Sequence, residues 1–385
     1  MLPDFAKQGP QNKSEAKEQP FQLAPVEFSQ IPGWKADSHS EIIPAFLRSC
    51  KSFLARPSAA KVGRRPEMGT VKDWAEICNT VSMIKPGNNV EARYFIESRF
   101  QAYAFGNKRS SRGLFTGYYE PLLRGSFQPD SRYKIPLLSK PKDLFYADLG
   151  KFKRELAGEK ITGRLRANQL IPYFSREEIE KGALKGNQLE ILWVDSEIDA
   201  FFLHIQGSGR ILLPDGTSVR VGFAGKNGHS YTSVGRELVG MGVMKLSKVT
   251  MPVIRLWMEQ NPLAARALMY KNKSYIFFRV LDKAGPIGSS GSVLTPGRSI
   301  AVDPRYTPYG SLVWLSTDFP GEKPRRPLRR LLVAQDTGSA IKGVVRGDVF
   351  WGEGPDAERR AGLMKSEGTL FILLPKSAAS APVQQ

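Results

Sequence analysis

The sequence predicts a mainly β protein with a helical N-terminal part and two β-rich units. Short apolar runs of strand length, separated by turns rich in Gly, Pro, Asn and Asp, recur from residue 111 onward. Helical periodicity is concentrated before residue 106. At 385 residues, the chain is long enough for two domains that build their own cores.

The N-terminal part is expected to be a helical layer behind a disordered lead-in. Residues 1–33 are rich in Gln, Lys, Pro and Ser and have little apolar surface to bury. Behind them, helices are expected over residues 41–56, 71–84 and 89–105. We interpret these helices as packing scaffold.

The two cysteines, Cys50 and Cys78, lie in the first two of these helices. One disulfide in an oxidising compartment and two buried free thiols are both compatible with that placement. Together with His39, His204 and His229 they form no cluster with metal-ligand spacing. We therefore expect no metal site and no cofactor.

A strand is expected over residues 111–123, where Thr116, Gly117, Tyr118 and Tyr119 put small and aromatic side chains next to one another. The favoured interpretation from these residues alone is an edge strand with two half-buried tyrosines. A functional role for this strand is the alternative.

A separate β-rich unit is expected between residues 124 and 245. Its strand candidates cover residues 133–138, 189–195, 198–214 and 218–225. Helices over 251–259 and 262–269 and a strand over 272–280 follow it.

Two polar pieces of this unit, residues 204–209 and 224–231, have too few glycines at the right spacing for a P-loop or a dinucleotide fingerprint. We interpret both as ligand-facing loops that carry hydrogen-bond donors. A tight hairpin and a helix cap are the respective alternatives.

The C-terminal third contains three aspartates, each placed just after or within a short apolar strand. Asp303 follows the run 299–302, Asp336 follows the run 331–334, and Asp348 lies within the run 344–351. The glycines around them let a ligand approach the backbone, and a nearby tryptophan offers a flat face for a sugar ring. The pattern favours carbohydrate chemistry, with Asx-turns or caps as the alternative for each aspartate.

The chain is strongly basic, with 56 Lys and Arg against 37 Asp and Glu and a net charge of +19. Such an excess favours an anionic partner. The basic residues are spread along the chain and no nucleic-acid signature accompanies them, so an acidic polymer ranks above DNA or RNA. No apolar run of membrane-spanning length is present, and the N-terminus has neither an apolar signal region nor a lipidation cysteine.

Several motifs occur together in one order: FTGYYEP, HIQGSGR, AGKNGHSY, AVDP and AQDTGSAIKG followed by RGDVFWGEGP. With them the chain resembles the membrane-bound lytic transglycosylase A family of peptidoglycan-cleaving enzymes over roughly residues 34–374. The resemblance implies a double-psi β-barrel domain with a second β domain inserted and a groove between them. The implied parts are a barrel domain of 34–121 and 247–376, including a three-aspartate domain at about 272–374, an inserted domain of 122–246, and a tail of 377–385.

The resemblance also implies the site. The family's catalytic carboxylate matches Asp348, which would act as acid and then as base to leave a 1,6-anhydromuramoyl end. Burial and the charge of a neighbouring aspartate would raise its pKa, whereas Arg346 would lower it. The expected substrate-binding residues are Asp336, Thr337, Asp303, Thr116, Gly117, Tyr118, Gln206, Ser208, Gly209, Lys226 and Trp351.

Glycan strands of peptidoglycan are the expected partner of a monomer in the periplasm or at the outer-membrane face, with membrane-surface association possible. Three alternative functions share some of these features. An aspartic protease would need a second Asp-Thr-Gly motif, which the chain lacks. A non-catalytic glycan-binding module would not need Asp348, and a metal-dependent glycan hydrolase is disfavoured by the few His and Cys residues.

Overall fold

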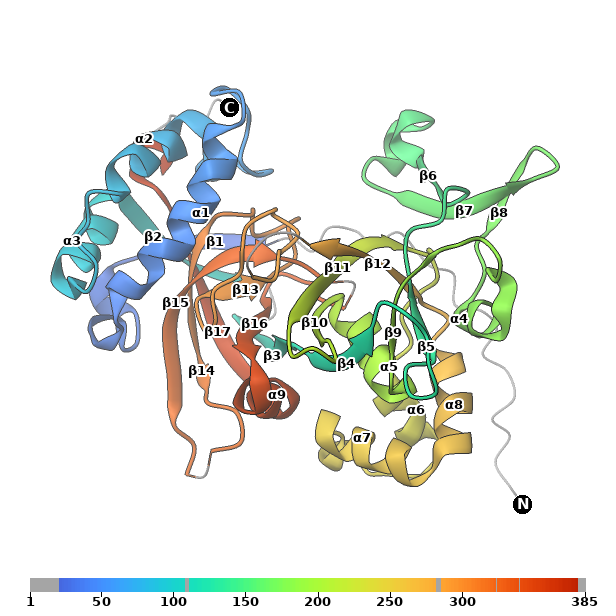
Figure 1. Cartoon of the computed structure of the whole chain (residues 1–385). Coiled ribbons are helices and arrows are strands. Elements are labelled where there is room, and N and C mark those ends of the chain that lie inside the picture. The colour runs from blue at the N-terminus through green and yellow to red at the C-terminus, as the bar shows by residue number, and fades with distance from the viewer. Residues whose placement is uncertain (1–20, 108–110, 282–284, 323, 339, 380–385) are drawn as a thin grey trace, which may run out of the picture.

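The computed structural model describes residues 21–107, 111–281, 285–322, 324–338 and 340–379. The larger of its two bodies is built around an eight-stranded sheet, at the left in Figure 1. The strands of this sheet are β1 (Phe21–Val26), β2 (Phe100–Asn107), β3 (Arg112–Glu120), β13 (Ser299–Ala301), β14 (Leu312–Asp318), β15 (Pro327–Asp336), β16 (Arg346–Glu353) and β17 (Lys365–Pro375).

Six of these strands close into a barrel in the order β17, β14, β15, β13, β16 and β3, because β17 pairs with β14 along one edge and with β3 along the other. The pairs β13–β15 and β16–β3 are parallel and the other pairs of the barrel are antiparallel. The strands are rich in Val, Leu, Ile and Trp, and their buried side chains form one continuous core. The predicted barrel fold is confirmed.

Helices α1 (Ile43–Leu54), α2 (Val71–Val81) and α3 (Asn89–Arg99) lie on the outside of this body, as Figure 1 shows. A disulfide joins Cys50 of α1 to Cys78 of α2, which resolves the alternative left open by the sequence. Helix α9 (Gly354–Leu363) covers β3 and β16 on another side.

Several N-terminal and C-terminal predictions are corrected. Residues 21–26 form β1, not part of a disordered lead-in, because Phe21 packs against Phe105 of β2; residues 1–20 lie outside the described residues. The third predicted helix stops at Arg99, and the residues after it form β2, which pairs with β17. The predicted tail begins with the short helix α10 (Lys376–Ala379).

The second body contains a six-stranded sheet in the order β12, β11, β10, β4, β9 and β5. Its strands are β4 (Leu122–Ser126), β5 (Ile135–Leu138), β9 (Glu190–Val194), β10 (Ser208–Leu212), β11 (Ser218–Lys226) and β12 (Ile276–Leu281). Its helices are α4 (Arg176–Glu178), α5 (Glu197–Gln206), α6 (Val234–Gly240), α7 (Met251–Gln260) and α8 (Pro262–Lys271).

Two predictions for this body are corrected. The expected strand over 198–214 is helix α5 followed by strand β10, because the Ser196 hydroxyl accepts a hydrogen bond from the backbone of Asp199 and starts a helix. The body also extends beyond residue 246, where the sequence placed its end. Strand β12 pairs with β11, and α7 and α8 share an apolar cluster with α5 and α6.

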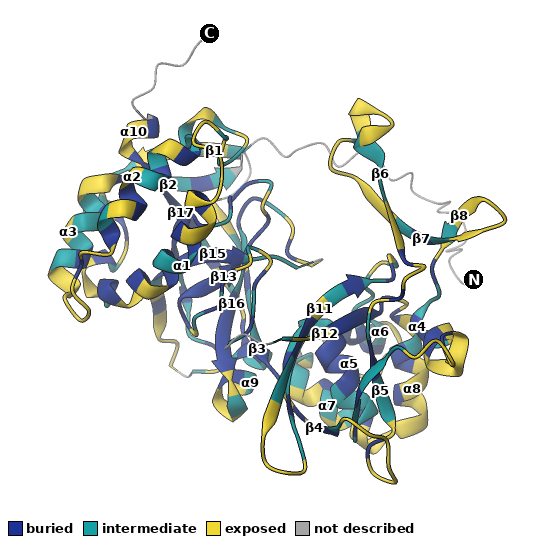
Figure 2. Cartoon of the chain, turned by 45° about the horizontal axis from the view of Figure 1, so that its top comes forward, coloured by how far each residue is buried: buried dark blue, intermediate teal, exposed yellow. Residues whose placement is uncertain are grey.

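A small three-stranded sheet projects from the second body (Figures 1 and 2). It consists of β6 (Phe145–Asp148), β7 (Lys160–Arg166) and β8 (Gln169–Pro172), and residues 145–172 are called the arm below. Within the described part of the chain, no helix has the length and apolarity needed to cross a membrane.

Candidate active site

Two of the three aspartates meet at one end of the barrel. Ala301 of β13 pairs with Asp336 of β15 on one side and with Asp348 of β16 on the other. Because neighbouring strands lie about 4.8 Å apart, the two aspartate backbones are separated by about 10 Å. Their carboxyl groups are close enough for the charge of Asp336 to raise the pKa of Asp348.

Asp348 is held from one side only. The Thr116 hydroxyl donates a hydrogen bond of 2.6 Å to its Oδ1 and accepts one of 2.9 Å from Arg346 Nη2. Parallel pairing of β16 with β3 sets Asp348 directly beside Thr116. No described residue donates a hydrogen bond to the second carboxyl oxygen, Oδ2, which is therefore available to a ligand.

The pKa of Asp348 is raised above its ordinary value. Burial is the largest cause, because it withholds water from the charged carboxylate, and the nearby charge of Asp336 acts in the same direction. Arg346 and the Thr116 hydrogen bond oppose this rise without cancelling it. Asp348 therefore keeps its proton to a higher pH than an ordinary aspartic acid, which is the direction of pKa shift that suits a general acid.

Asp336 is held much more firmly. The Tyr118 hydroxyl donates to its Oδ2 at 2.9 Å, and the backbone and hydroxyl of Ser289 donate to its Oδ1 at 2.9 and 2.8 Å. Burial raises the pKa of Asp336 although these hydrogen bonds lower it. Burial followed by the charge of Asp336 raises the pKa of Tyr118 well above its ordinary value, so the phenol stays a donor. Asp336 thus acts as a fixed acceptor rather than as a free acid.

A groove between the two bodies runs past both carboxyl groups. Its main part has a volume of about 570 Å³ and continues into a recess of about 210 Å³ that contains Asp348. The groove and recess are lined by Gly117, Tyr118, Gln206, Ser208, Lys226, Asp336, Thr337 and Asp348, all predicted from the sequence.

Polar groups from the second body face this groove. The Gln206 side-chain oxygen is buried and has no hydrogen-bond partner among the described residues. Such an atom is costly to leave unpaired, which favours a ligand donor at this point. Burial and then the neighbouring Lys342 lower the pKa of Lys226. Two ammonium groups close together favour an anionic group on the ligand.

Four predicted site residues do not line the groove. Trp351 is only 7% exposed and lies against Gly117 and beneath the Arg360 guanidinium, so it offers no stacking face to a sugar. Asp303 is buried and bonded to Arg305 and the Gly343 backbone. Gly209 lies in the interior of the second body against Leu203, and Thr116 contributes through its hydrogen bond to Asp348.

The interpretation of residues 111–123 as an edge strand is also wrong. Strand β3 lies between β16 and β17 in the barrel wall, which positions Tyr118 inside the site. Sequence reasoning missed Ser289 and Lys342. The Ser- and Gly-rich run around Ser289 was the available signal for a loop that can donate backbone and hydroxyl hydrogen bonds.

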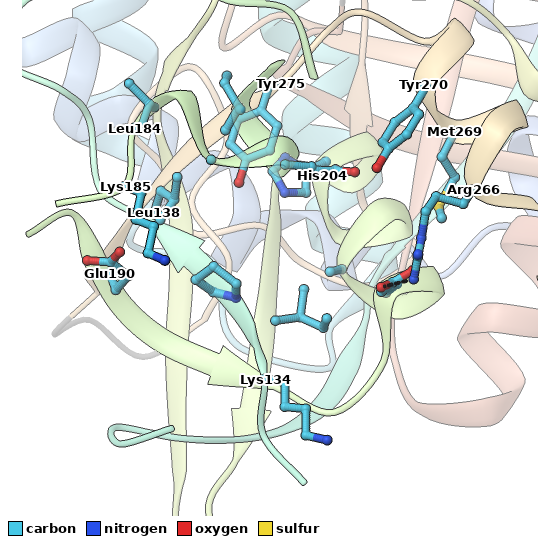
Figure 3. A pocket seen from close by; sticks show the side chains of 17 residues that line it. Lys134, Leu138, Leu184, Lys185, Glu190, His204, Arg266, Met269, Tyr270 and Tyr275 are labelled. Carbon is cyan, nitrogen blue, oxygen red and sulfur yellow. Dashed lines mark hydrogen bonds and ion pairs between the residues drawn. The ribbon is translucent and has the colours of Figure 1, made fainter. Parts of the chain in front are cut away.

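His204 belongs to helix α5 rather than to a ligand-facing loop. Its Nδ1 accepts a hydrogen bond of 3.1 Å from the Ile276 backbone, and burial followed by the charge of Arg176 lowers its pKa well below the ordinary value. The neutral ring also lines a second cavity of about 400 Å³, shown in Figure 3 with Tyr270 and Tyr275 in its wall. Neither Asp336 nor Asp348 lines this cavity.

Comparisons with known proteins match both bodies. Residues 114–279 match a family model described as the MltA specific insert domain, and residues 298–374 match the 3D domain. The first match includes β12, α7 and α8, in agreement with their packing.

Two curated relatives carry the name membrane-bound lytic murein transglycosylase A. The protein from Vibrio cholerae is 31% identical over 283 residues, which cover 72% of this chain and 70% of the relative. The protein from Escherichia coli K12 is 32% identical over 264 residues, covering 67% of this chain and 65% of the relative.

Solved structures of similar fold match this chain over nearly its whole length. A membrane-bound lytic murein transglycosylase from Agrobacterium tumefaciens is 30% identical with a TM-score of 0.83, covering 93% of this chain and 99% of that one. MltA from Neisseria gonorrhoeae is 31% identical with a TM-score of 0.75, covering 92% and 91%.

Proposed function

Because this chain belongs to the family of membrane-bound lytic murein transglycosylases A, we propose that it cleaves the β-1,4 bond between N-acetylmuramic acid and N-acetylglucosamine in peptidoglycan and leaves a 1,6-anhydromuramoyl end. The chain is an enzyme that acts on murein by family membership. The bond cleaved, the product and the catalytic residue are the proposed part.

Asp348 carries out both proton transfers in this proposal. Its carboxylic acid protonates the glycosidic oxygen, so the bond from that oxygen to C1 of the muramoyl residue breaks and N-acetylglucosamine leaves with a 4-hydroxyl. The resulting carboxylate then takes the proton from the muramoyl C6 hydroxyl while O6 bonds to C1. Asp348 ends protonated and no water is consumed, so a second catalytic carboxylate is not needed.

The state of Asp348 is the observation that carries the proposal. A carboxyl group with a raised pKa, one oxygen held by Thr116 and the other without a described partner fits a group that gives and takes a proton. Asp336 has its oxygens occupied by donors and is better suited to holding a sugar hydroxyl or an N-acetyl group. We assign the same binding role to Gln206 and place an acidic substituent of the polymer near Lys226.

Mass spectrometry of the soluble products tests the proposal. Purified peptidoglycan is incubated with the protein, with its Asp348→Asn variant, and with an Asp303→Asn variant as the matched control. We expect anhydro-muropeptides from the protein and the control and none from Asp348→Asn. Reducing-end products would mean hydrolysis by water, and a complete absence of products with retained peptidoglycan binding would favour a binding module.

The pH dependence gives an independent check. If protonated Asp348 is the active form, kcat/KM falls as the pH rises through the pKa of Asp348 in the free enzyme. Since that pKa is raised, activity should persist to a higher pH than an ordinary aspartic acid would allow. A rate that increases over the same pH range would contradict the role of Asp348 as the acid.

We also propose that the protein works outside the cytoplasm, in the periplasm or at the outer membrane. The disulfide between Cys50 and Cys78 supports this, because structural disulfides persist in oxidising compartments. Thiol alkylation of the protein in freshly lysed cells is the test. Both cysteines should be protected until a reductant is added, whereas rapid alkylation without reductant would place the protein in a reducing compartment.

A further inference from the structure

The second cavity lies outside the groove and takes no part in the chemistry proposed above. It is bounded by strand β5, helices α5 and α8 and residues 179–185 (Figure 3). Of the residues that line it, only His204 also lines the groove. Its volume of about 400 Å³ falls among those of small-molecule sites, about 300–1,000 Å³. The cavity is therefore a separate place where a small ligand fits.

Tyr275 contributes a buried donor to this cavity. Its side chain is 3% exposed, and Figure 3 shows its hydroxyl directed into the cavity. This hydroxyl forms no hydrogen bond with a described residue. Burial, followed by the charge of Glu180, raises the pKa of Tyr275, so the hydroxyl keeps its proton. A buried donor is costly to leave unpaired, which favours an acceptor on a ligand.

His204 contributes a second donor next to the first. The centroids of the His204 and Tyr275 rings are 4.2 Å apart. Because Nδ1 of the neutral His204 ring accepts from the Ile276 backbone, its proton is on Nε2. No described residue forms a hydrogen bond with Nε2. Two neighbouring donors of this kind suit a carboxylate or an amide oxygen.

Glu180 contributes an acceptor beside these donors. Nη1 of Arg176, a residue that is 1% exposed, donates to Oε1 of Glu180 at 2.7 Å. The Arg176 guanidinium also lies over the Tyr275 ring, 5.3 Å from its centroid. Oε2 of Glu180 receives no hydrogen bond from a described residue. The cavity thus offers a fixed acceptor next to two donors, which suits a ligand that carries groups of both kinds.

Unpaired charges also line the cavity. Arg266 forms an ion pair of 2.6 Å with Glu197, so these two neutralise each other. Lys134, Lys185 and Glu190 also line the cavity and form no ion pair with a described residue. Two free ammonium groups and one free carboxylate complement a ligand with two carboxylates and one ammonium group.

We propose that the second cavity binds a short acidic peptide. An amide or carboxylate oxygen of the peptide would accept from Tyr275 and His204, and its ammonium group would lie near Glu180 and Glu190. Its free carboxylates would face the two lysines. This binding requires no glycan cleavage, so it holds or fails independently of the proposed function.

Other ligands fit less well. A sugar needs a free aromatic face, but the Tyr275 ring already contacts His204 and Arg176. The Lys181 ammonium lies over the ring of Tyr270, the other tyrosine of the cavity, 5.7 Å from its centroid. An inorganic anion would meet the negative charge of Glu190 without offering it a donor. A peptide supplies partners of both signs.

Isothermal titration calorimetry of the full chain tests the proposal without turnover. The probe is the dipeptide alanylglutamate, which has two carboxylates and one ammonium group, and its uncharged analogue N-acetyl-alanylglutamine amide is the ligand control. Tyr275→Phe removes only a hydroxyl and Lys185→Gln only a charge. Tyr103→Phe, at a buried tyrosine of β2, and Lys153→Gln, at an exposed lysine of the arm, are the matched control variants.

We expect saturable binding of alanylglutamate with a Kd of about 1 mM or lower and no measurable binding of the analogue. Tyr275→Phe should weaken binding about tenfold, because it leaves a charged acceptor without its donor. Lys185→Gln should weaken it about two- to fivefold, and added salt should reduce this difference. Both control variants should bind like the parent. The Tm of Tyr275→Phe should be unchanged or higher, because the lost hydroxyl has no described partner.

Four results would overturn the proposal. They are the absence of saturable binding up to about 10 mM dipeptide, equal binding by Tyr275→Phe, equal binding of the uncharged analogue, and a Tyr275→Phe variant with a Tm lower by several degrees, which would reveal a structural role for the hydroxyl. Lys226→Gln guards against binding in the groove. Weaker dipeptide binding in this variant and not in Lys185→Gln would place the peptide beside Lys226 and would also overturn the proposal.

Two sources supply this ligand chemistry: a free peptide and a peptide still attached to peptidoglycan. Soluble peptidoglycan fragments with and without their peptides distinguish them. If the attached peptide enters the cavity, Tyr275→Phe weakens binding of the peptide-bearing fragments and leaves binding of the stripped fragments unchanged. If only a free peptide enters, Tyr275→Phe weakens binding of the dipeptide and neither kind of fragment is affected.

Discussion

The same substitution at two aspartates of the barrel should have opposite effects on stability. Asp348 and Asp303 are both withdrawn from water, but the pKa of Asp348 is raised and that of Asp303 is lowered. Burial alone would raise the pKa of Asp303, but hydrogen bonds from Arg305 and from the Gly343 backbone lower it by more. An aspartate-to-asparagine change therefore removes an unfavourable charge at one site and a favourable one at the other.

At neutral pH we expect Asp348→Asn to raise the free energy of unfolding by about 1 kcal/mol, a typical gain when a costly active-site group is replaced. A raised folded-state pKa means that the native state holds its proton more tightly than the unfolded chain does. The cost of the charge thus grows as the pH rises through the folded pKa and disappears in acid. The difference between this variant and the parent should shrink as the pH falls.

Asp303→Asn should lower the free energy of unfolding by about 2–3 kcal/mol, because it breaks an ion pair with one partner fully buried. A lowered folded-state pKa contributes stability above the unfolded value of about 3.9, and this is lost as the pH falls through the folded pKa. For activity, the order of the two variants should be the opposite of their order in stability. Asp348→Asn should lose at least about 10³-fold in kcat, since in the proposed mechanism this one group supplies both proton transfers, whereas folded Asp303→Asn should keep most of its activity.

Urea unfolding between pH 4 and pH 8, paired with product release from peptidoglycan, measures both effects on the same samples. An Asp348→Asn variant that is less stable than the parent at neutral pH would contradict burial as the source of the raised pKa of Asp348. An Asp303→Asn variant that unfolds at the same urea concentration as the parent would contradict a stabilising charge at position 303.

Three further substitutions test other parts of the structure. Tyr118→Phe removes the 2.9 Å hydrogen bond to Asp336, so we expect the free energy of unfolding to fall by about 1–2 kcal/mol. If Asp336 binds sugar, KM for soluble glycan should rise by a larger factor than kcat falls. Unchanged urea unfolding and unchanged kinetics would contradict this. Replacing Cys50 and Cys78 with Ser removes the disulfide between positions 28 residues apart, so loop entropy should lower the free energy of unfolding by about 3–4 kcal/mol. The variant should show a lower Tm that reductant no longer changes. A variant as stable as the oxidised parent would refute this. Gly113→Ala would place a Cβ atom 1.7 Å from a backbone carbonyl oxygen, so we expect loss of soluble protein or a Tm lower by several degrees. An unchanged Tm would show that the backbone of the barrel can shift to accept the methyl group.

Local signals in the sequence located the two aspartates that line the groove and its recess. Asp336 and Asp348 follow or lie in apolar strands with glycines around them, and those patterns span fewer than twenty-five residues. The helical period likewise predicted α1 and α2, because their buried positions repeat every three to four residues. The helical period did not predict helix α5, because its apolar run resembles a buried strand. Only the capping residue Ser196 distinguishes it from a strand.

Local patterns in the chain identify the groups suited to the chemistry: a carboxylic acid in a glycine-rich strand, its neighbouring acceptor and a strong excess of basic residues. Which of these groups meet in the groove depends on contacts between distant segments. Thr116 reaches Asp348 across 232 positions of the chain, and β3 became a wall of the barrel instead of an edge. Trp351 has the composition of a sugar platform, yet helix α9 packs over the strand that carries it. Local patterns report propensity and period, whereas exposure and partners depend on which distant segments pack together.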